Sequence, residues 1–85
     1  MQNLEIIHLR SVGSLAERVC DEIRAAVDQV KNVTVYRRDG LETDVCIHIR
    51  HSSELNGEPS QLGHQLAAAL KNYGLVEQTY WKALA

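Results

Sequence analysis

The chain has 85 residues, a formal net charge of −2 and a hydrophobic fraction of 45%. A chain of this length forms one small domain, so we expect residues 1–85 to fold as a single unit. The near-neutral charge gives no general reason to expect a nucleic acid or an anionic membrane as a partner. The sequence lacks the run of about 18 apolar residues that a membrane-spanning helix needs. Its two cysteines form no C-x-x-C pair, which suits a reducing cytoplasm.

Residues 4–10 predict a first strand with apolar side chains on both faces. Such a strand usually lies at the centre of its sheet, where neighbours cover it. A helix over about residues 14–31 follows, because Ser14 and Glu17 form a capping box. Its apolar stripe recurs at helical spacing and consists of Leu15, Val19, Ile23, Val27 and Val30, with Ala26 at its margin. We expect Asn32 to end the helix in the left-handed conformation.

Residues 33–37 predict a second strand, and Asp39-Gly40 predicts the turn of a hairpin. A two-residue loop would pair Arg38 with Leu41 and mix apolar with polar side chains on each face. A three-residue loop, with a left-handed Gly40, would pair Arg37 with Leu41 and keep the apolar side chains together. We expect the three-residue loop, because the register of a strand normally follows its buried face.

The third strand, within residues 43–51, carries the most chemically diverse surface of the chain. One face is apolar and the other holds a thiol, an imidazole and a guanidinium; the alternating residues are Val45, Ile47 and Ile49 against Cys46, His48 and Arg50. A functional site is therefore expected on the second of these faces.

A second helix is expected after the polar segment that ends near Pro59, which suits the first turn of a helix. Its predicted core stripe consists of Leu62, Leu66, Ala69, Leu70 and Tyr73. Gly74 is expected to end the helix as its C′ residue. Valine, threonine, tyrosine and tryptophan in close succession then predict a fourth strand over about residues 76–83.

The resulting order is βαββαβ. This order predicts an α+β fold, the ferredoxin-like plait, in which a four-stranded antiparallel sheet carries two helices on one face. The first and third strands would be its central pair.

With a helix running into Gly74-Leu75-Val76 and an aromatic last strand that contains Tyr80-Trp81, the chain resembles the small dimeric α+β-barrel proteins, including the antibiotic-biosynthesis-monooxygenase-like families. The resemblance is one of topology over the full length. It implies ferredoxin-like protomers whose open sheet faces pack together as a homodimer. It assigns no catalytic residue to this sequence.

The sheet face away from the helices is the candidate site. We expect ligand-binding residues there, because guanidinium groups recognise carboxylates or phosphates bidentately: His8, Arg10, Tyr36, His48 and Arg50. His8 and Arg10 belong to this face if Ile7 and Leu9 point to the helices, and the sequence leaves open which face of the first strand is core. A small anionic ligand is the corresponding expectation. If the face is instead catalytic, His48 is the best candidate for acid–base chemistry, since an imidazole titrates near neutrality. The alternative without a ligand is a sheet face that is solvated or buried in a dimer.

Other site types are not favoured by the sequence. Cys46, His48 and either His8 or His51 could be considered as metal ligands, but His51 should point to the opposite side of the strand. We therefore expect no metal and no other cofactor. RNA binding on such a sheet needs aromatic residues on the central strands, and neither central strand has one.

Two functions follow from these observations. The first is a small homo-oligomeric binding or interaction domain that uses the open sheet face. The alternative is a small cofactor-independent enzyme of the dimeric α+β-barrel, monooxygenase-like type. Cys20, at the margin of the first helix stripe, is expected to be a buried and inert thiol.

Overall fold

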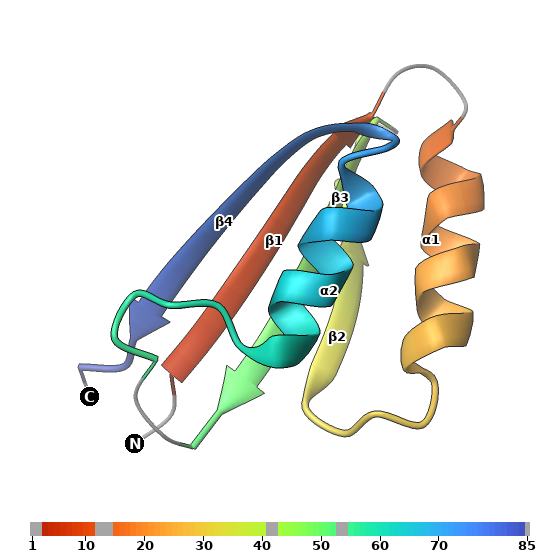
Figure 1. The fold of residues 1–85 in the computed structure, drawn as a ribbon. Coiled ribbons are helices and arrows are strands. Elements are labelled where there is room, and N and C mark those ends of the chain that lie inside the picture. The colour runs from red at the N-terminus through yellow and green to blue at the C-terminus, as the bar shows by residue number, and fades with distance from the viewer. Residues whose placement is uncertain (1–2, 12–14, 41–42, 53–54, 85) are drawn as a thin grey trace.

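The structure is a computed structural model that describes residues 3–11, 15–40, 43–52 and 55–84. Six elements follow one another along the chain (Figure 1): β1 (Asn3–Ser11), α1 (Leu15–Val27), β2 (Val33–Arg37), β3 (Asp44–His51), α2 (Gln61–Leu70) and β4 (Gly74–Lys82). The predicted βαββαβ order is confirmed.

All strand pairs in the sheet are antiparallel, and the strand order is β2-β3-β1-β4. Both helices lie on one face of this sheet (Figure 1). Helix α1 packs on β2 and β3, and α2 packs on β1 and β4. The fold is therefore the predicted ferredoxin-like plait, and β1 and β3 are its central strands.

The core lies between the sheet and the two helices. Alternate side chains of β1 and β3 enter it: Ile7, Leu9, Val45, Ile47 and Ile49 are buried. Val19, Ile23 and Val27 of α1 and Ala67 and Leu70 of α2 cover them. Because side chains alternate along a strand, the intervening residues point to the opposite face: Leu4, Ile6, His8 and Arg10 of β1, and Asp44, Cys46, His48 and Arg50 of β3.

Helix α1 ends earlier than the sequence predicts. Val27 is its last residue and its last buried side chain, whereas Val30 lies beyond the helix and is 39% exposed. Asn32 adopts the predicted left-handed conformation, with φ 71°, but it does so after the helix has already ended. The predicted capping residue Ser14 and the side chain of Leu15 lie outside the described part of the chain.

The predicted hairpin register is wrong. Arg37 pairs with Val45 rather than with Leu41, so the connection between β2 and β3 is longer than three residues. The observed register sets Val33 opposite Ile49 and Val35 opposite Ile47. These two apolar cross-strand pairs favour the longer loop. The observed register differs from the predicted register by an even number of residues, so the side chains of β2 still point to the predicted faces of the sheet.

Two local predictions for α2 are also wrong. Ser60, not Pro59, begins the helix: it is the N-cap, and its hydroxyl accepts a hydrogen bond from the Gly63 N–H at 2.9 Å. Ala69 is exposed rather than buried. The face that meets the sheet is instead formed by Gly63, Ala67 and Leu70, with Leu62 and Leu66 at its sides.

Strand β4 is present as predicted, but Gly74 does not have the predicted role. It is the first residue of β4 and pairs with Ser11, rather than ending α2 as a C′ residue. A Cβ atom at this position would collide with the Arg10 carbonyl. The close approach of two backbones explains the glycine here.

Glu5 is fully buried on the helix-facing side of β1. Its carboxylate accepts hydrogen bonds from the Ser60 hydroxyl at 2.6 Å and from the Ser60 N–H at 3.1 Å. Gln78 donates through Nε2 at 2.9 Å, and His51 Nε2 lies 3.0 Å away. The carboxylate therefore joins β1, β3, β4 and the start of α2.

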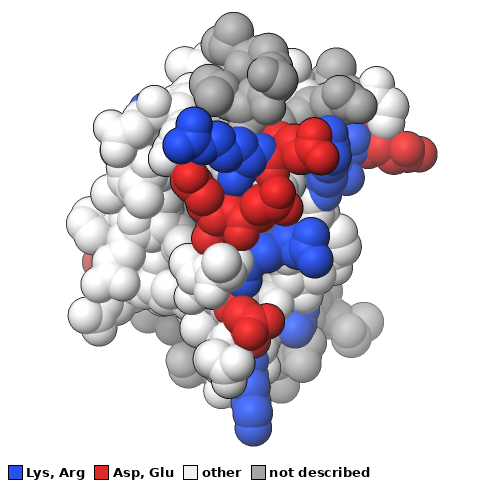
Figure 2. All heavy atoms as spheres, turned by 90° about the vertical axis from the view of Figure 1, so that its right-hand side faces the viewer, with Lys and Arg blue, Asp and Glu red and all other residues white. Residues whose placement is uncertain are grey.

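The outer face of α1 carries charges of both signs. Figure 2 shows acidic and basic side chains beside one another there, and Arg18 pairs with Glu22 while Arg24 pairs with Asp21. These four residues are exposed to solvent. Neither described helix has the length and apolar character needed to cross a membrane.

Candidate functional site

The face of the sheet away from the helices, here called the open face, gathers side chains from all four strands. Strand register places Leu4, Ile6, His8 and Arg10 of β1 beside Asp44, Cys46, His48 and Arg50 of β3. The outer strands add Thr34 and Tyr36 of β2, and Leu75, Glu77, Thr79 and Trp81 of β4. The predicted site residues therefore all lie on one face.

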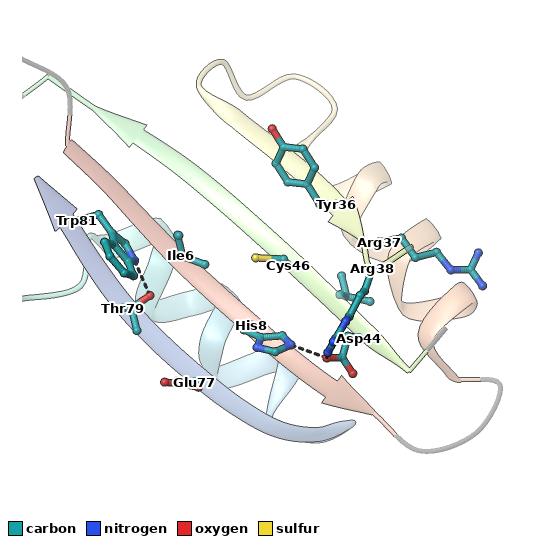
Figure 3. Close-up of a pocket in the computed structure, with 11 residues that line it drawn as sticks. Ile6, His8, Tyr36, Arg37, Arg38, Asp44, Cys46, Glu77, Thr79 and Trp81 are labelled. Carbon is teal, nitrogen blue, oxygen red and sulfur yellow. Dashed lines mark hydrogen bonds and ion pairs between the residues drawn. The ribbon is translucent and has the colours of Figure 1, made fainter. Parts of the chain in front are cut away.

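A hollow of about 460 Å³ lies on the open face (Figure 3), and we call it the central hollow. Ile6, His8 and Cys46 lie on the central strands within it, and Tyr36 and Trp81 border it from the two outer strands. Trp81 donates its indole N–H to Thr79 Oγ1 at 2.9 Å, which orients the ring. The remaining lining residues are Arg37, Arg38, Asp44, Val45, Glu77 and Thr79.

Asp44 is the charged centre of one end of the hollow, although it is only 2% exposed. Its Oδ2 lies 2.8 Å from His8 Nε2 and 3.4 Å from Arg38 Nη1 (Figure 3). Its Oδ1 accepts a hydrogen bond from Thr43 Oγ1 at 3.0 Å and lies 3.6 Å from Arg10 Nε. Four side chains thus surround one buried carboxylate.

These partners keep Asp44 ionised. Burial alone would raise the pKa of its carboxyl, because a low dielectric disfavours the charged form. The hydrogen bonds from His8 and Thr43, the charge of Arg10 and the hydrogen bond from Arg38 together outweigh burial. The pKa of Asp44 is therefore below its usual value of 3.8.

Because Asp44 is an acceptor, His8 presents an N–H at Nε2 to it. Among the described residues, Asp44 is the one hydrogen-bond partner shown for the His8 ring. The carboxylate fixes the orientation of the ring, and Nδ1 is then left as the hydrogen-bond acceptor of the ring. This arrangement suits either hydrogen bonding to a ligand or acid–base chemistry.

The predicted site residues do not form one cluster. His8 and Tyr36 line the central hollow, whereas Arg10 borders a smaller depression of about 180 Å³ beside it. His48 and Arg50 line another hollow of about 370 Å³, which Tyr36 and Trp81 also border. The His48 ring packs against Tyr36 with centroids 4.5 Å apart, and Arg50 donates to Thr34 Oγ1 at 2.8 Å.

His48 should make stability depend on pH. Burial, and then the charge of Arg50, lower the pKa of His48 below its usual value of 6.5. The unfolded chain therefore binds the proton more readily, and the free energy of unfolding should fall as the pH falls from 7 through about 6.5 and below. Urea unfolding between pH 7.5 and pH 5, at one protein concentration, should show a smaller decrease for His48→Gln. Parallel curves for the two proteins would contradict this assignment.

The thiols do not resemble reactive cysteines. Burial raises the pKa of Cys46 and also that of Cys20, which therefore remain thiols at neutral pH. Among the described residues, no group of three or more histidine, cysteine or acidic side chains is arranged to hold a metal ion. His51 contacts Glu5 on the helix side, away from Cys46 and His48.

The sequence did not single out four residues that shape the central hollow: Arg38, Asp44, Glu77 and Trp81. Asp44 shares the face of Cys46, His48 and Arg50 by strand parity, but the sequence pattern does not identify it as the centre of a cluster. Asp44 lies directly opposite Arg10 and diagonally across from His8, whose own partner is Cys46. This position would have revealed the cluster, but it is known only once the pairing of β1 with β3 is known. Arg38 was hidden because it lies in the loop whose length was predicted incorrectly.

The fold and this site define the class of the protein: an α+β protein with a ferredoxin-like plait and a hollowed, aromatic-edged open sheet face. No protein-family model, curated protein or solved structure matches the chain. The functional argument therefore depends on the residues of the open face.

Proposed function

We propose that the chain is a homodimeric binding domain that pairs through its open face and binds a small anionic molecule there. One observation carries the proposal. The described part of the chain has five large hydrophobic side chains that are exposed, and three of them lie on the open face: Tyr36 at 47%, Leu75 at 76% and Trp81 at 59%. Exposed apolar side chains gathered on one face mark an interaction surface.

A second copy of the chain fits the chemistry of this face. In a two-fold dimer the same surface meets itself, so it must be self-complementary. The open face has an apolar middle at Ile6 and Cys46, and it carries charges of both signs, such as Arg50 and Glu77. Apolar middles can then pack together while opposite charges pair around them.

The central hollow supports the binding part of the proposal. Its volume falls in the usual range for small-molecule sites, roughly 300–1,000 Å³. It combines apolar walls with a few polar groups at one end, near His8 and Arg38. A second copy over the open face would shield this hollow from solvent and strengthen polar contacts inside it.

The geometry of His8 supports a second candidate function, that of a small cofactor-independent enzyme. Asp44 holds the His8 ring at 2.8 Å inside the hollow, which is how an acid–base histidine is commonly oriented. His8 is a better candidate than the predicted His48, which packs against Tyr36 and beside Arg50. The topological resemblance to the dimeric α+β-barrel proteins agrees with this alternative.

Sedimentation velocity at pH 7.5 tests the dimer. Between about 10 and 50 µM the chain should sediment mainly as a dimer, because a Kd of about 1 µM, or about 8 kcal/mol, leaves most of the chain paired at these concentrations. A monomer throughout this range would overturn the proposed dimer. Native mass spectrometry of the purified chain would then show whether a small molecule remains bound, and its mass would restrict what that molecule is.

A further inference from the structure

We infer that the central hollow is specific for small monocarboxylates with an apolar body, with the carboxylate bound at Arg38 and the body placed along Ile6 towards Trp81. This inference rests on the proposed binding function and names its ligand class. It follows from three properties of the hollow: which charged groups are already satisfied, where they lie, and what surrounds them.

Asp44 is not available to a ligand. It is almost completely buried, and its two oxygens already face His8, Arg38, Thr43 and Arg10. A carboxylate with so many donors gains little from a further one. Asp44 therefore positions its neighbours instead of binding the ligand itself.

Arg38 has binding capacity that Asp44 does not use. Its side chain is 56% exposed, and it reaches Asp44 through Nη1 alone, at the long distance of 3.4 Å. A guanidinium has five N–H donors in a planar fork that matches a carboxylate. The fork can therefore bind a ligand carboxylate while Nη1 remains near Asp44.

The opposite wall limits where the anionic group can lie. Glu77 sits beside His8 on β4, and its carboxylate would repel an anion placed near it. The anionic group is therefore favoured at the β2–β3 end, beside Arg38. Trp81 and Ile6 then line the space left for the rest of the ligand, which they can cover with apolar surface. A single negative charge at one end of an apolar body fits this distribution.

Phenylacetate and 2-phenylethanol are suitable probes, because they share a ring and a two-carbon chain and differ in the carboxylate. Trp81 is the only tryptophan of the chain, so its indole N–H gives one resolved NMR signal that reports directly on the hollow. Titration at pH 7.5 should shift this signal saturably. Phenylacetate should bind at least about tenfold more tightly than 2-phenylethanol, as expected for a charge-assisted hydrogen bond.

Two arginine variants provide a matched comparison. Arg38 and Arg10 both contact Asp44, but of the two only Arg38 lines the central hollow. Arg38→Gln should abolish the preference for phenylacetate, whereas Arg10→Gln should change its affinity by no more than about twofold, as for an exposed charge. Glu77→Gln should tighten phenylacetate binding and leave 2-phenylethanol unchanged.

The outcomes separate this inference from the proposed dimer, because sedimentation is measured on the same samples. A dimer that binds both probes equally, or neither of them, overturns the ligand class and leaves the dimer standing. A monomer that prefers phenylacetate through Arg38 overturns the dimer but supports the ligand class. Equal losses in Arg38→Gln and Arg10→Gln would show an effect transmitted through Asp44 and would also overturn the inference.

Discussion

Gly63→Ala should destabilise the fold by about 3 kcal/mol, although general helix propensity favours alanine over glycine by up to about 1 kcal/mol. The expected loss arises because a Cβ atom at Gly63 would occupy the position of the Glu5 carboxylate, colliding with Oε1, Oε2 and Cδ. To admit the methyl group, the carboxylate would have to leave its donors or α2 would have to move away from the sheet.

Either adjustment is costly. Glu5 is fully buried and receives hydrogen bonds from Ser60 and Gln78, with His51 also in contact. Displacing a buried charge from its partners costs about 3–5 kcal/mol. For a domain of this size, a loss of about 3 kcal/mol corresponds to a decrease in Tm of roughly 12–24 °C.

A double-mutant cycle with Glu5→Ala tests the cause. Glu5→Ala alone should also destabilise, since it leaves the buried donors of Ser60 and Gln78 unsatisfied, at about 1–3 kcal/mol for each such group. In that background the collision is gone, so Gly63→Ala should be neutral or stabilising. Thermal unfolding followed by circular dichroism measures all four proteins. Equal losses from Gly63→Ala in both backgrounds would disprove the proposed contact.

Glu5 also shows what sequence patterns capture and what they miss. Alternation puts Glu5, Ile7 and Leu9 on one face of β1, but both faces of this strand carry apolar residues, so the pattern leaves open which of them meets the helices; the structure turns Glu5, Ile7 and Leu9 towards the helices. A single sequence does not show that Ser60 and Gln78 meet this carboxylate, because they lie 55 and 73 residues away from it. The side of α2 that meets the sheet is the one that carries Gly63, which makes room for the carboxylate, together with Ala67 and Leu70. Ala69 lies outside this side, so its assignment to the core was incorrect.

For the open face, too, the sequence predicts which residues of a strand share a face but not which residues of different strands meet. Strand parity correctly places His8 with Arg10 and His48 with Arg50, because the periodicity of two residues is a local property. That both pairs share the open face depends in addition on which face of β1 meets the helices. Their separation into different hollows depends on how far each residue lies along its strand. That position follows from the pairing of β1 with β3 and β4, which the alternating pattern does not determine. Asp44 was overlooked for this reason.

The two buried carboxylates divide the molecule into a structural side and a candidate functional side. Glu5 lies towards the helices, and its partners hold α2 onto the sheet. Asp44 lies on the open face, and two of its partners, His8 and Arg38, also line the central hollow. Substitution of Glu5 should therefore affect mainly stability, whereas substitution of Arg38 should affect mainly ligand recognition.

Ile6→Lys should dissociate the proposed homodimer while leaving the protomer folded. Ile6 lies on the open face of central strand β1, directly between His48 of β3 and Thr79 of β4. In the protomer it is only half-buried, so a lysine can extend its ammonium group into water. In a face-to-face dimer the same ammonium group would be enclosed against the second copy without a matched carboxylate, at a cost of several kcal/mol.

This cost should weaken association by more than about 100-fold, since each 1.4 kcal/mol corresponds to a factor of ten. Gln65→Lys is the matched control: it introduces the same charge at an exposed position on α2, on the opposite side of the sheet. Sedimentation velocity at 20 µM, with circular dichroism to verify folding, should give a monomer for Ile6→Lys and a dimer for Gln65→Lys. If folded Ile6→Lys remains dimeric while Gln65→Lys dissociates, the interface lies on the helix side and the open face is not where the copies meet.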